Sequence, residues 1–409
     1  MNLQNIHKRI PVVTTIILVI LFLNLFFARA VTVNWSSDMQ LTIDLAWDID
    51  PSIAQMADET IWVVWASDRT DFQNDIYYKT SADNGVSWAG DTRLTFDSGE
   101  DIMPSIMQTA DGTIWVVWAS SQTENFELFF KTSVNNGVSW STDTQLTINP
   151  NADVGPSIMQ HQNGTIWVAW ASNRGGTHDI YHKTSHDNGL TWSPDTQLTT
   201  DLSWDLHPSI IEAIDGTIWV AWASYRTGDF EIFYKKSTDN GASWSSDTQL
   251  TTNNGDDEAP SIIQTRDSSF WVVWQSDRKG KQYDIYYTDS RDNGSTWFSD
   301  TQLTTDNADD MSPTIMNSHE GRIWIAWTSP RILDQFDIFY TISDIVQIPG
   351  DVDGDGDVDL DDLYYVLIAY GMTIEDAMTT YGVPEGTDID NDGLIDLDDL
   401  YQVLWNYGA

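Results

Sequence analysis

The chain has 409 residues, enough for a large core or for more than one domain. Its formal net charge at pH 7 is -43, from 62 aspartates and glutamates against 19 lysines and arginines, which argues against the nucleic-acid backbone as a partner. Because the sequence contains no cysteine, disulfides and thiolate metal sites are excluded, and acidic oxygen ligands are the remaining route to a bound metal.

Residues 1–30 have the layout of a secretory signal peptide. Lys8 and Arg9 precede an apolar run over residues 10–27, and Ala-Arg-Ala at residues 28–30 supplies a small-residue cleavage site. We expect cleavage after Ala30 and a secreted protein. The alternative is an uncleaved membrane anchor, because the apolar run approaches the length that spans a bilayer.

A short motif of the type Ile-Trp-Val-Val-Trp recurs six times. Each copy is apolar, rich in β-branched and aromatic residues and too short for a buried helix, which predicts a strand buried on both faces. A proline precedes each copy at intervals of 52 or 53 residues, and this period indicates a propeller or solenoid. The prolines are Pro51, Pro104, Pro156, Pro208, Pro260 and Pro313.

The second repeat shows the predicted unit. Short strands are expected over residues 104–108, 114–118, 127–131 and 144–147, with an Asp-Gly turn between the first two. Four antiparallel strands repeated radially make a propeller blade.

The sixth repeat lacks a fourth strand of its own. Residues 34–42 copy residues 139–147 of the second repeat, so we predict that the N-terminal segment supplies the missing strand. The ring would then close with six blades over residues 31–345, which removes the exposed edges of an open array.

The turn after the third strand has a motif of its own. Five repeats carry Ser-x-Asp-x-Gly-x-Ser/Thr-Trp, with Asn135 replacing the aspartate in the second copy. An aspartate here can accept backbone N–H bonds across a turn that glycine permits, and the tryptophan packs the turn against the blade. These turns resemble the Asp-box (BNR) repeat of sialidase-like propellers, over roughly residues 31 to 345.

That resemblance implies a sialidase-like glycoside hydrolase as one possible activity. Catalysts of that family carry an arginine triad, with one arginine in an Arg-Ile-Pro motif of the first blade, whereas this chain has Asp50-Pro51 and no such motif. Arginines do follow five of the second strands, each with an acid within six residues. Groups repeated in this way favour ion pairs that brace a loop over a catalytic triad. The pairs are Arg69 with Asp75, Arg174 with Asp179, Arg226 with Glu231, Arg278 with Asp284 and Arg331 with Asp337.

Residues that break the repeat are the better site candidates. Trp47 and Trp204 occupy equivalent loops leading to blades one and four, on the face predicted to lie opposite the Asp boxes. With His207 they are candidate ligand-binding residues, because exposed tryptophan beside acids and amides is a common sugar-stacking surface. The alternative is that the two tryptophans only cap the central channel.

The candidate catalytic residues come from blade four. They are Glu212, which replaces a glutamine of the neighbouring repeats, and Tyr225 and Arg226. A tyrosine and a glutamate on the same rim could serve covalent glycoside chemistry.

The composition changes abruptly at residue 351. Two segments place oxygen-bearing side chains at loop positions 1, 3, 5, 9 and 12, glycine at 6 and a backbone carbonyl at 7, as a calcium loop of the EF-hand type requires. A solvated acidic tail would need neither the glycines nor the spacing. We predict two Ca²⁺ ions, one held by Asp351, Asp353, Asp355, Asp357, Asp359 and Asp362, and the other by Asp388, Asp390, Asp392, Leu394, Asp396 and Asp399.

Each loop runs into a predicted helix, and the duplication resembles a type I dockerin over residues 351–409, after a linker at 346–350. The resemblance implies binding to a cohesin domain of a scaffolding or surface protein. These residues include sixteen acids and no lysine or arginine, so we expect the module to order only with calcium. Loop positions 10 and 11 hold Leu-Asp in both halves, where many dockerins carry hydroxyl residues, which leaves the cohesin open.

The sequence therefore predicts a secreted, all-β six-bladed propeller joined to a small α-helical dockerin with two calcium loops. We expect the dockerin to bind a cohesin and the propeller to bind carbohydrate or protein, in polysaccharide breakdown. The alternatives are a sialidase-like hydrolase acting on O-glycosyl bonds and a structural component of a cell-surface scaffold.

Overall fold

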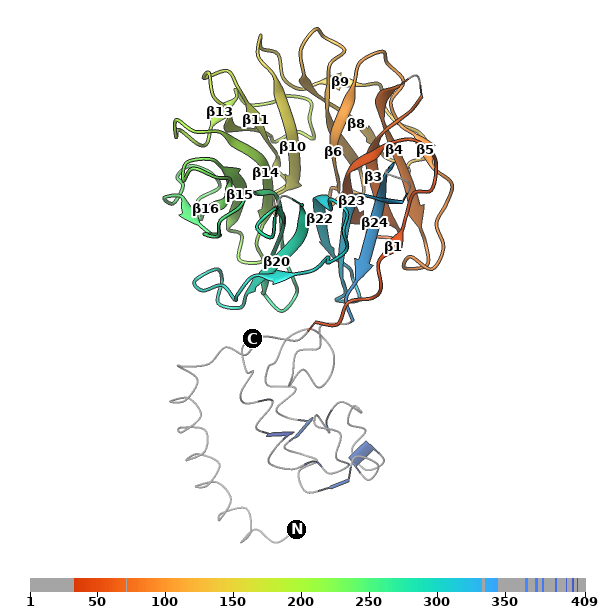
Figure 1. Ribbon diagram of the computed structural model, residues 1–409, viewed down its shortest axis with the longest axis vertical. Coiled ribbons are helices and arrows are strands. Elements are labelled where there is room, and N and C mark those ends of the chain that lie inside the picture. The colour runs from red at the N-terminus through yellow and green to blue at the C-terminus, as the bar shows by residue number, and fades with distance from the viewer. Residues whose placement is uncertain are drawn as a thin grey trace.

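The computed structural model describes residues 33–344, except 71, 281 and 333–334, together with isolated residues after 364. Residues 33–344 form six four-stranded antiparallel sheets that are arranged radially around a central axis (Figure 1). The prediction of an all-β propeller with six blades is confirmed. Within the described part of the chain, no helix is long and apolar enough to cross a membrane.

Each blade contains an inner, a second, a third and an outer strand, and blades are numbered one to six in the chain order of their inner strands. The inner strands are β2 (Asp48–Gln55), β6 (Asp101–Gln108), β10 (Asp153–Gln160), β14 (Asp205–Glu212), β18 (Asp257–Gln264) and β22 (Met311–Asn317). The second strands are β3 (Ile61–Thr70), β7 (Ile114–Ser120), β11 (Ile166–Ser172), β15 (Ile218–Ser224), β19 (Phe270–Ser276) and β23 (Ile323–Ile332). The third strands are β4 (Gln73–Ser81), β8 (Glu127–Ser133), β12 (Asp179–Ser185), β16 (Glu231–Ser237), β20 (Asp284–Ser290) and β24 (Gln335–Ile342). The outer strands are β5 (Thr92–Arg93), β9 (Thr144–Gln145), β13 (Thr196–Gln197), β17 (Thr248–Gln249), β21 (Thr301–Gln302) and β1 (Met39–Gln40).

The second strands form the core between blades, as their uniformly apolar sequence predicts. All seven residues of β7 are buried, and both of its tryptophans are shielded from solvent. The apolar clusters join adjacent blades: Trp62 of blade one packs in the same cluster as Ile106 and Trp118 of blade two. Each face of the apolar part of a second strand is therefore covered by a neighbouring sheet.

The N-terminal segment closes the ring, as predicted. Strand β1 pairs antiparallel with β24, with Met39 opposite Tyr340, and the two strands lie side by side in Figure 1. The Leu41 amide donates to the Ile338 carbonyl at 2.7 Å, and Trp35 forms a further bridge to Ser343. The outer strand of blade six thus comes from the opposite end of the propeller sequence.

The Asp-box turns have the hydrogen bonds that the motif predicts. Asp83 Oδ1 accepts from the Ser87 amide at 2.8 Å, and Ser81 Oγ accepts from the Gly85 amide at 2.8 Å. The Ser87 hydroxyl also donates to Asp83 Oδ2, and this bond and the amide bond lower the pKa of Asp83, because they stabilise its charged form. In the second copy Asn135 accepts the equivalent bond through its side-chain oxygen.

The box residues also join neighbouring blades. The ring of Trp140, from the box of blade two, packs edge-on against Trp62 of blade one with centroids 6.2 Å apart. The box glycine lies against the same tryptophan: a Cβ added at Gly137 would come within 2.3 Å of the Trp62 ring. The turn therefore packs against the preceding blade and helps to fix the angle between blades.

Gly137→Ala is expected to destabilise the protein more than Gly112→Ala. Both glycines have a positive φ, 75° and 86°, where alanine costs about 1–2 kcal/mol. Only Gly137 faces a buried ring, whereas nothing lies within 4 Å of a Cβ at Gly112, so overpacking adds about 1–3 kcal/mol at Gly137 alone. Urea unfolding of the two variants measures the difference, and equal losses would show that the contact with Trp62 is unimportant.

Candidate functional site

Every inner strand has a bulge at the residue that precedes its proline. Proline has no N–H for the ladder, and in β2 the pairing register shifts between Ile49 and Ser52. The residue before the proline has a φ of 50–61° in each blade, and such a bulge turns its side chain away from the regular pleat. The six bulge residues are Asp50, Met103, Gly155, His207, Ala259 and Ser312.

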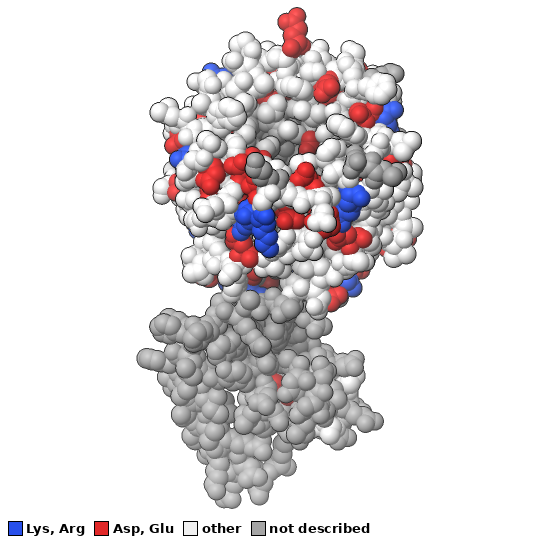
Figure 2. Space-filling model, viewed as in Figure 1, with Lys and Arg blue, Asp and Glu red and all other residues white. Residues whose placement is uncertain are grey.

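The bulge residues line a funnel on the propeller axis. Together with the prolines and the hydroxyl residues that follow them, they surround a cavity of about 250 Å³, near the lower end of small-molecule sites. Figure 2 shows a hollow near the centre of this face of the propeller, with acidic side chains around it. The prolines repeat around the ring but the bulge residues all differ, so the funnel is where the six-fold symmetry of the scaffold is broken.

A chain of hydrogen bonds forms one wall of the funnel, across blades five, six and one. Ser312 Oγ donates to Asp50 Oδ1 at 2.8 Å, and the Ser312 amide donates to Gln275 Oε1 at 2.7 Å. Gln275 Nε2 donates in turn to Glu258 Oε2 at 3.2 Å. This wall was not predicted from the sequence. A signal was present, because an alanine follows the second tryptophan in blades one to four, whereas Gln275 takes this position in blade five and Thr328 in blade six.

Burial sets the protonation of the groups at the funnel. It raises the pKa of Asp50, and it raises the pKa of Glu258 to about 7, with Asp256 adding to the effect. Burial also lowers the pKa of His207 to about 4, so this ring is neutral at pH 7. A carboxyl group that keeps its proton near neutral pH can donate a hydrogen bond or act as a general acid.

The predicted rim tryptophans lie on the face where the funnel opens. Trp47 and Trp204 come three residues before the bulges of β2 and β14, and these strands face each other across a ring of six. The Tyr225 amide, in the loop between second and third strands, donates to the Trp204 carbonyl at 2.9 Å. This contact confirms that both kinds of loop share one face, opposite the Asp boxes.

Both tryptophans expose about half of their surface to solvent, 50% for Trp47 and 53% for Trp204. Trp47 packs edge-on against Phe336 at 5.4 Å, and Trp204 packs edge-on against His178 at 6.0 Å. Neither tryptophan lines the funnel itself. Of the three predicted ligand-binding residues, His207 does line it. The indoles therefore form two aromatic surfaces on the rim, each held from one side.

The structure corrects the grouping of Glu212 with this rim. Glu212 is the last residue of β14, so it lies at the Asp-box end of the propeller, away from His207. Its Oε2 accepts from the Gln162 amide of the preceding blade at 2.6 Å, and Gln108 makes the same link to Ala57 at 2.7 Å. Glu212 thus replaces a structural glutamine.

Tyr225 does lie on the rim, where it is 47% exposed and packs edge-on against Phe230 at 5.1 Å. Arg226 belongs to a network that recurs in other blades. Its Nη1 donates to Asp247 at 2.6 Å and its Nη2 to Asp205 at 3.2 Å. The structure therefore does not bring the three candidate catalytic residues together.

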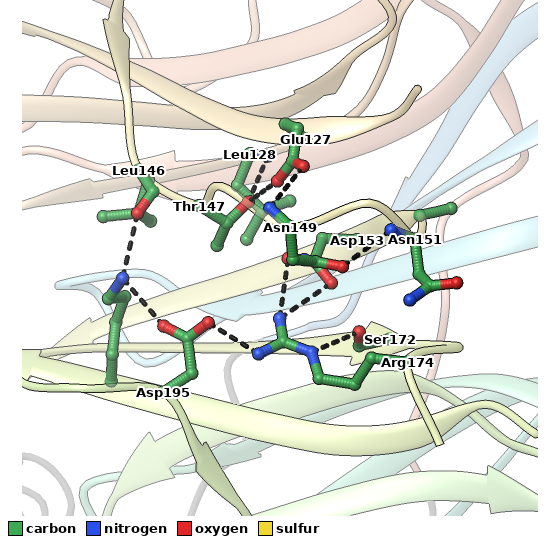
Figure 3. Close-up of polar contacts among 12 residues, drawn as sticks. Glu127, Leu128, Leu146, Thr147, Asn149, Asn151, Asp153, Ser172, Arg174 and Asp195 are labelled. Atoms are coloured by element: carbon green, nitrogen blue, oxygen red, sulfur yellow. Dashed lines mark hydrogen bonds and ion pairs between the residues drawn. The ribbon is translucent and has the colours of Figure 1, made fainter. Parts of the chain in front are cut away.

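The recurring arginines form ion pairs, as predicted, but with different acids. In blade three, Arg174 donates to Asp195 at 2.7 Å, to Asp153 at 2.9 Å and to Ser172 at 2.9 Å, as Figure 3 shows. Asp179, the expected partner, is not in this network. Equivalent pairs join Arg69 to Asp48 and Asp91, Arg226 to Asp205 and Asp247, Arg278 to Asp257 and Asp300, and Arg331 to Asp310 and Asp38. Each arginine connects the start of an inner strand to the residue before the outer strand.

Blade two lacks this arginine and has Gln122 at the equivalent position. Asp101, which matches the buried aspartate of the other blades, instead accepts a bond from Trp118 Nε1 at 3.0 Å. Asp101 has no exposed surface, and its burial raises its pKa to about 7.

Asp101 is expected to make stability depend on pH. Its pKa is about 3.9 in an unfolded chain, so its contribution is complete below pH 4 and is lost as pH rises through 7. Between pH 5 and pH 8 the wild type should lose about 2–3 kcal/mol relative to Asp101→Asn, which cannot ionise. Urea unfolding of both proteins at the two pH values checks this, and parallel pH profiles would contradict it.

Most of the predicted calcium ligands lie outside the described residues. Of the twelve, only Asp399 is described, and it is buried. Nearby, the Ile395 amide donates to the Met372 carbonyl at 2.8 Å, and Ile395 is buried. In the described part of the chain no group of three or more acidic or histidine side chains could hold a metal. The structure does not test the calcium sites or the dockerin resemblance.

A closed ring of six four-stranded sheets with Asp-box turns and a variable axial funnel defines the class of this protein: it is an Asp-box propeller. The model of the BNR repeat-like domain matches residues 46–194 and 150–335. The chain therefore belongs to the BNR repeat family. No curated protein matches the sequence.

Solved structures with this fold include glycoside hydrolases. A protein of unknown function from Dyadobacter fermentans is 16% identical, with a TM-score of 0.67 over 76% of this chain and 99% of its own. The α-L-arabinanase of Penicillium chrysogenum, solved with arabinobiose, is 14% identical, with a TM-score of 0.60 over 76% and 99%. The Hadza microbial sialidase Hz136 is 16% identical, with a TM-score of 0.58 over 72% and 65%. At these identities the likeness shows the fold alone.

Proposed function

We propose that the propeller binds carbohydrate at the funnel and its rim, and that the C-terminal module, loaded with calcium, attaches the protein to a cohesin. The observation that carries the proposal is the pair of half-exposed tryptophans, Trp47 and Trp204, on opposite sides of a funnel lined by hydrogen-bonding groups. Sugars bind by stacking their apolar faces on aromatic rings and by bonding their hydroxyls to a few fixed polar groups. The rim supplies the rings, and Asp50 and Ser312 supply polar groups.

The carbohydrate proposal is tested with a glycan array and calorimetry on the secreted chain in calcium buffer. The Trp47→Ala/Trp204→Ala variant should bind its best glycan about tenfold or more weakly than the wild type. Leu202→Ala is the control, because Leu202 is 91% exposed and lies two residues from Trp204. Undiminished binding by the double variant would exclude the rim as the site. No glycan bound by the wild type would exclude the proposal.

A glycoside hydrolase is the second candidate. Asp50 lines the funnel, and Glu258 accepts a hydrogen bond from Gln275, which also lines it. Burial raises the pKa of Glu258 to about 7, and two carboxyl groups with different protonation suit an acid and base pair. Only one of the two carboxyls reaches the described lining, so binding is the better-supported function. Release of sugar from fluorogenic glycosides that Asp50→Asn or Glu258→Gln abolishes would establish the hydrolase. Glu212→Gln, at the opposite end of the propeller, is the matched control.

The attachment role rests on the sequence of residues 351–409. Two calcium loops would neutralise part of a segment with sixteen acids, so Ca²⁺ should raise its helix content, and a chelator should reverse this. Binding to a panel of cohesins should disappear with the chelator. The near-identity of the two loops suggests that either half can face the partner, so Asp362→Ala and Asp399→Ala should each weaken docking only in part. If the protein binds a cohesin but neither binds nor cleaves any sugar, the remaining interpretation is that it is a structural component of a scaffold.

A further inference from the structure

The charges around the funnel bear on the kind of sugar that it accepts. Its described lining contains the carboxylate of Asp50 and the ring of His207, and no lysine or arginine. Burying an anion in a lining that has no cation is strongly unfavourable, and carboxylates are most often recognised by arginine. The described lining offers no such partner.

The nearby arginines are already committed to structural pairs. Arg278 of blade five donates to Asp257 at 3.0 Å and to Asp300 at 2.7 Å, and its guanidinium lies 4.2 Å from the ring centroid of Tyr286. The arginines of blades one, three, four and six are bound by equivalent aspartates. Turning one of them toward the axis would leave a fully buried aspartate without a cation, at a cost of several times the thermal energy.

Gln275 organises the polar wall that remains. It is buried, and in blades one to four the equivalent residue is an alanine. Its side chain uses one amide hydrogen on Glu258 and its oxygen on the Ser312 amide, which fixes Ser312 where its hydroxyl bonds to Asp50. A carboxylate and a hydroxyl held in this way match the hydroxyls of a neutral sugar, which both donate and accept hydrogen bonds.

We infer that the funnel selects uncharged sugars over sugar acids, and that Gln275 is the positioning residue for this selection. The inference rests on the proposed carbohydrate binding and names its ligand class. It distinguishes this chain from an Asp-box propeller that recognises a sugar carboxylate, although the scaffold is the same.

The experiment compares neutral oligosaccharides of arabinose, xylose and glucose with sialyllactose and oligogalacturonate by calorimetry at two salt concentrations. The wild type should bind a neutral sugar at least about tenfold more tightly than either sugar acid. Gln275→Ala, which restores the alanine of the other blades, should weaken neutral binding about tenfold without lowering the unfolding midpoint by more than a few degrees. Met103→Lys, which places a cation in the funnel, should narrow the preference against sugar acids.

The outcomes separate the inference from the function on which it rests. Tighter binding of a sugar acid by the wild type overturns the inference and leaves carbohydrate binding standing. Full neutral binding by Gln275→Ala overturns the role of Gln275. If Trp47→Ala/Trp204→Ala loses binding while Gln275→Ala and Met103→Lys change nothing, sugars bind on the rim alone and the funnel has no part in selection. If no sugar binds at all, both proposals fail.

Discussion

Arg278→Met is expected to lower the free energy of unfolding by about 3–5 kcal/mol, because it leaves a buried carboxylate without its cation. Arg278 Nη2 lies 3.0 Å from Asp257, whose side chain has no exposed surface, and its Nη1 lies 2.7 Å from Asp300. The guanidinium also sits over the ring of Tyr286, so the substitution removes a cation–π contact as well. Methionine keeps much of the volume and none of the charge.

Blade two shows how the altered blade should behave. There Gln122 replaces the arginine, and burial raises the pKa of Asp101 to about 7. In Arg278→Met the pKa of Asp257 should rise in the same way, so the loss of stability should be largest at pH 8 and smaller at pH 5.

Urea unfolding at pH 8 measures this loss, with Lys279→Met as the matched control. Lys279 is the next residue in the chain, carries the same charge and is exposed, so its removal should cost less than about 1 kcal/mol. Asp257→Asn combined with Arg278→Met should recover part of the loss, since the fully buried carboxylate is then also removed and only the partly exposed Asp300 is left without its arginine. Equal losses of unfolding free energy in Arg278→Met and Lys279→Met would show that the buried pair contributes little.

The fold was predictable because its determinants are local and repeated. The apolar, tryptophan-rich composition of the second strands predicts that they are buried strands. Gly137 marks a turn whose positive φ favours glycine. Even the contribution of the N-terminal strand could be read from the near-identity of residues 34–42 with residues 139–147. The partner of the box tryptophan could not be predicted from the sequence, because the local motif does not indicate that Trp140 packs against the preceding blade.

The candidate site was only partly predictable, because it depends on distances that a repeat pattern does not contain. Glu212 is five residues from His207, but these residues lie in one extended strand, so about 17 Å of strand separates them and the glutamate lies toward the other face. Conversely, Asp50 and Ser312 are 262 residues apart in the chain and meet at 2.8 Å because the ring closes. The arginine partners were wrongly predicted for the same reason. The acids expected as partners lie in the third strands, whereas each arginine bonds to aspartates at the start of the inner strand and before the outer strand.

Removing the N-terminal strand is expected to open the ring. A chain that starts at residue 43 loses the buried side chain of Leu41 and the bonds of Thr42, which accepts from the Ile338 amide at 2.9 Å and donates to Asp337 at 3.2 Å. Lys79 of blade one also loses the Leu41 carbonyl, to which it donates at 2.8 Å. At about 2 kcal/mol for the leucine and about 1 kcal/mol for each of these three hydrogen bonds, these contacts alone account for a loss of roughly 5 kcal/mol.

The truncation should also change the association state, because β24 becomes an unpaired edge strand. Its residues Phe339 and Tyr340, which pair with β1 in the intact chain, then lie on this edge. We expect lower stability by urea unfolding, and dimers or larger species by sedimentation, relative to a chain that starts at residue 31. The control is Ser37→Thr/Met39→Thr, which makes residues 35–42 identical to residues 140–147 of blade two and should keep a closed monomer. A truncated chain that stays monomeric and equally stable would show that blade six does not need its fourth strand. The ring closure that brings Asp50 to Ser312 would then be independent of β1, since blades six and one also meet through contacts of β2 with β22, β23 and β24.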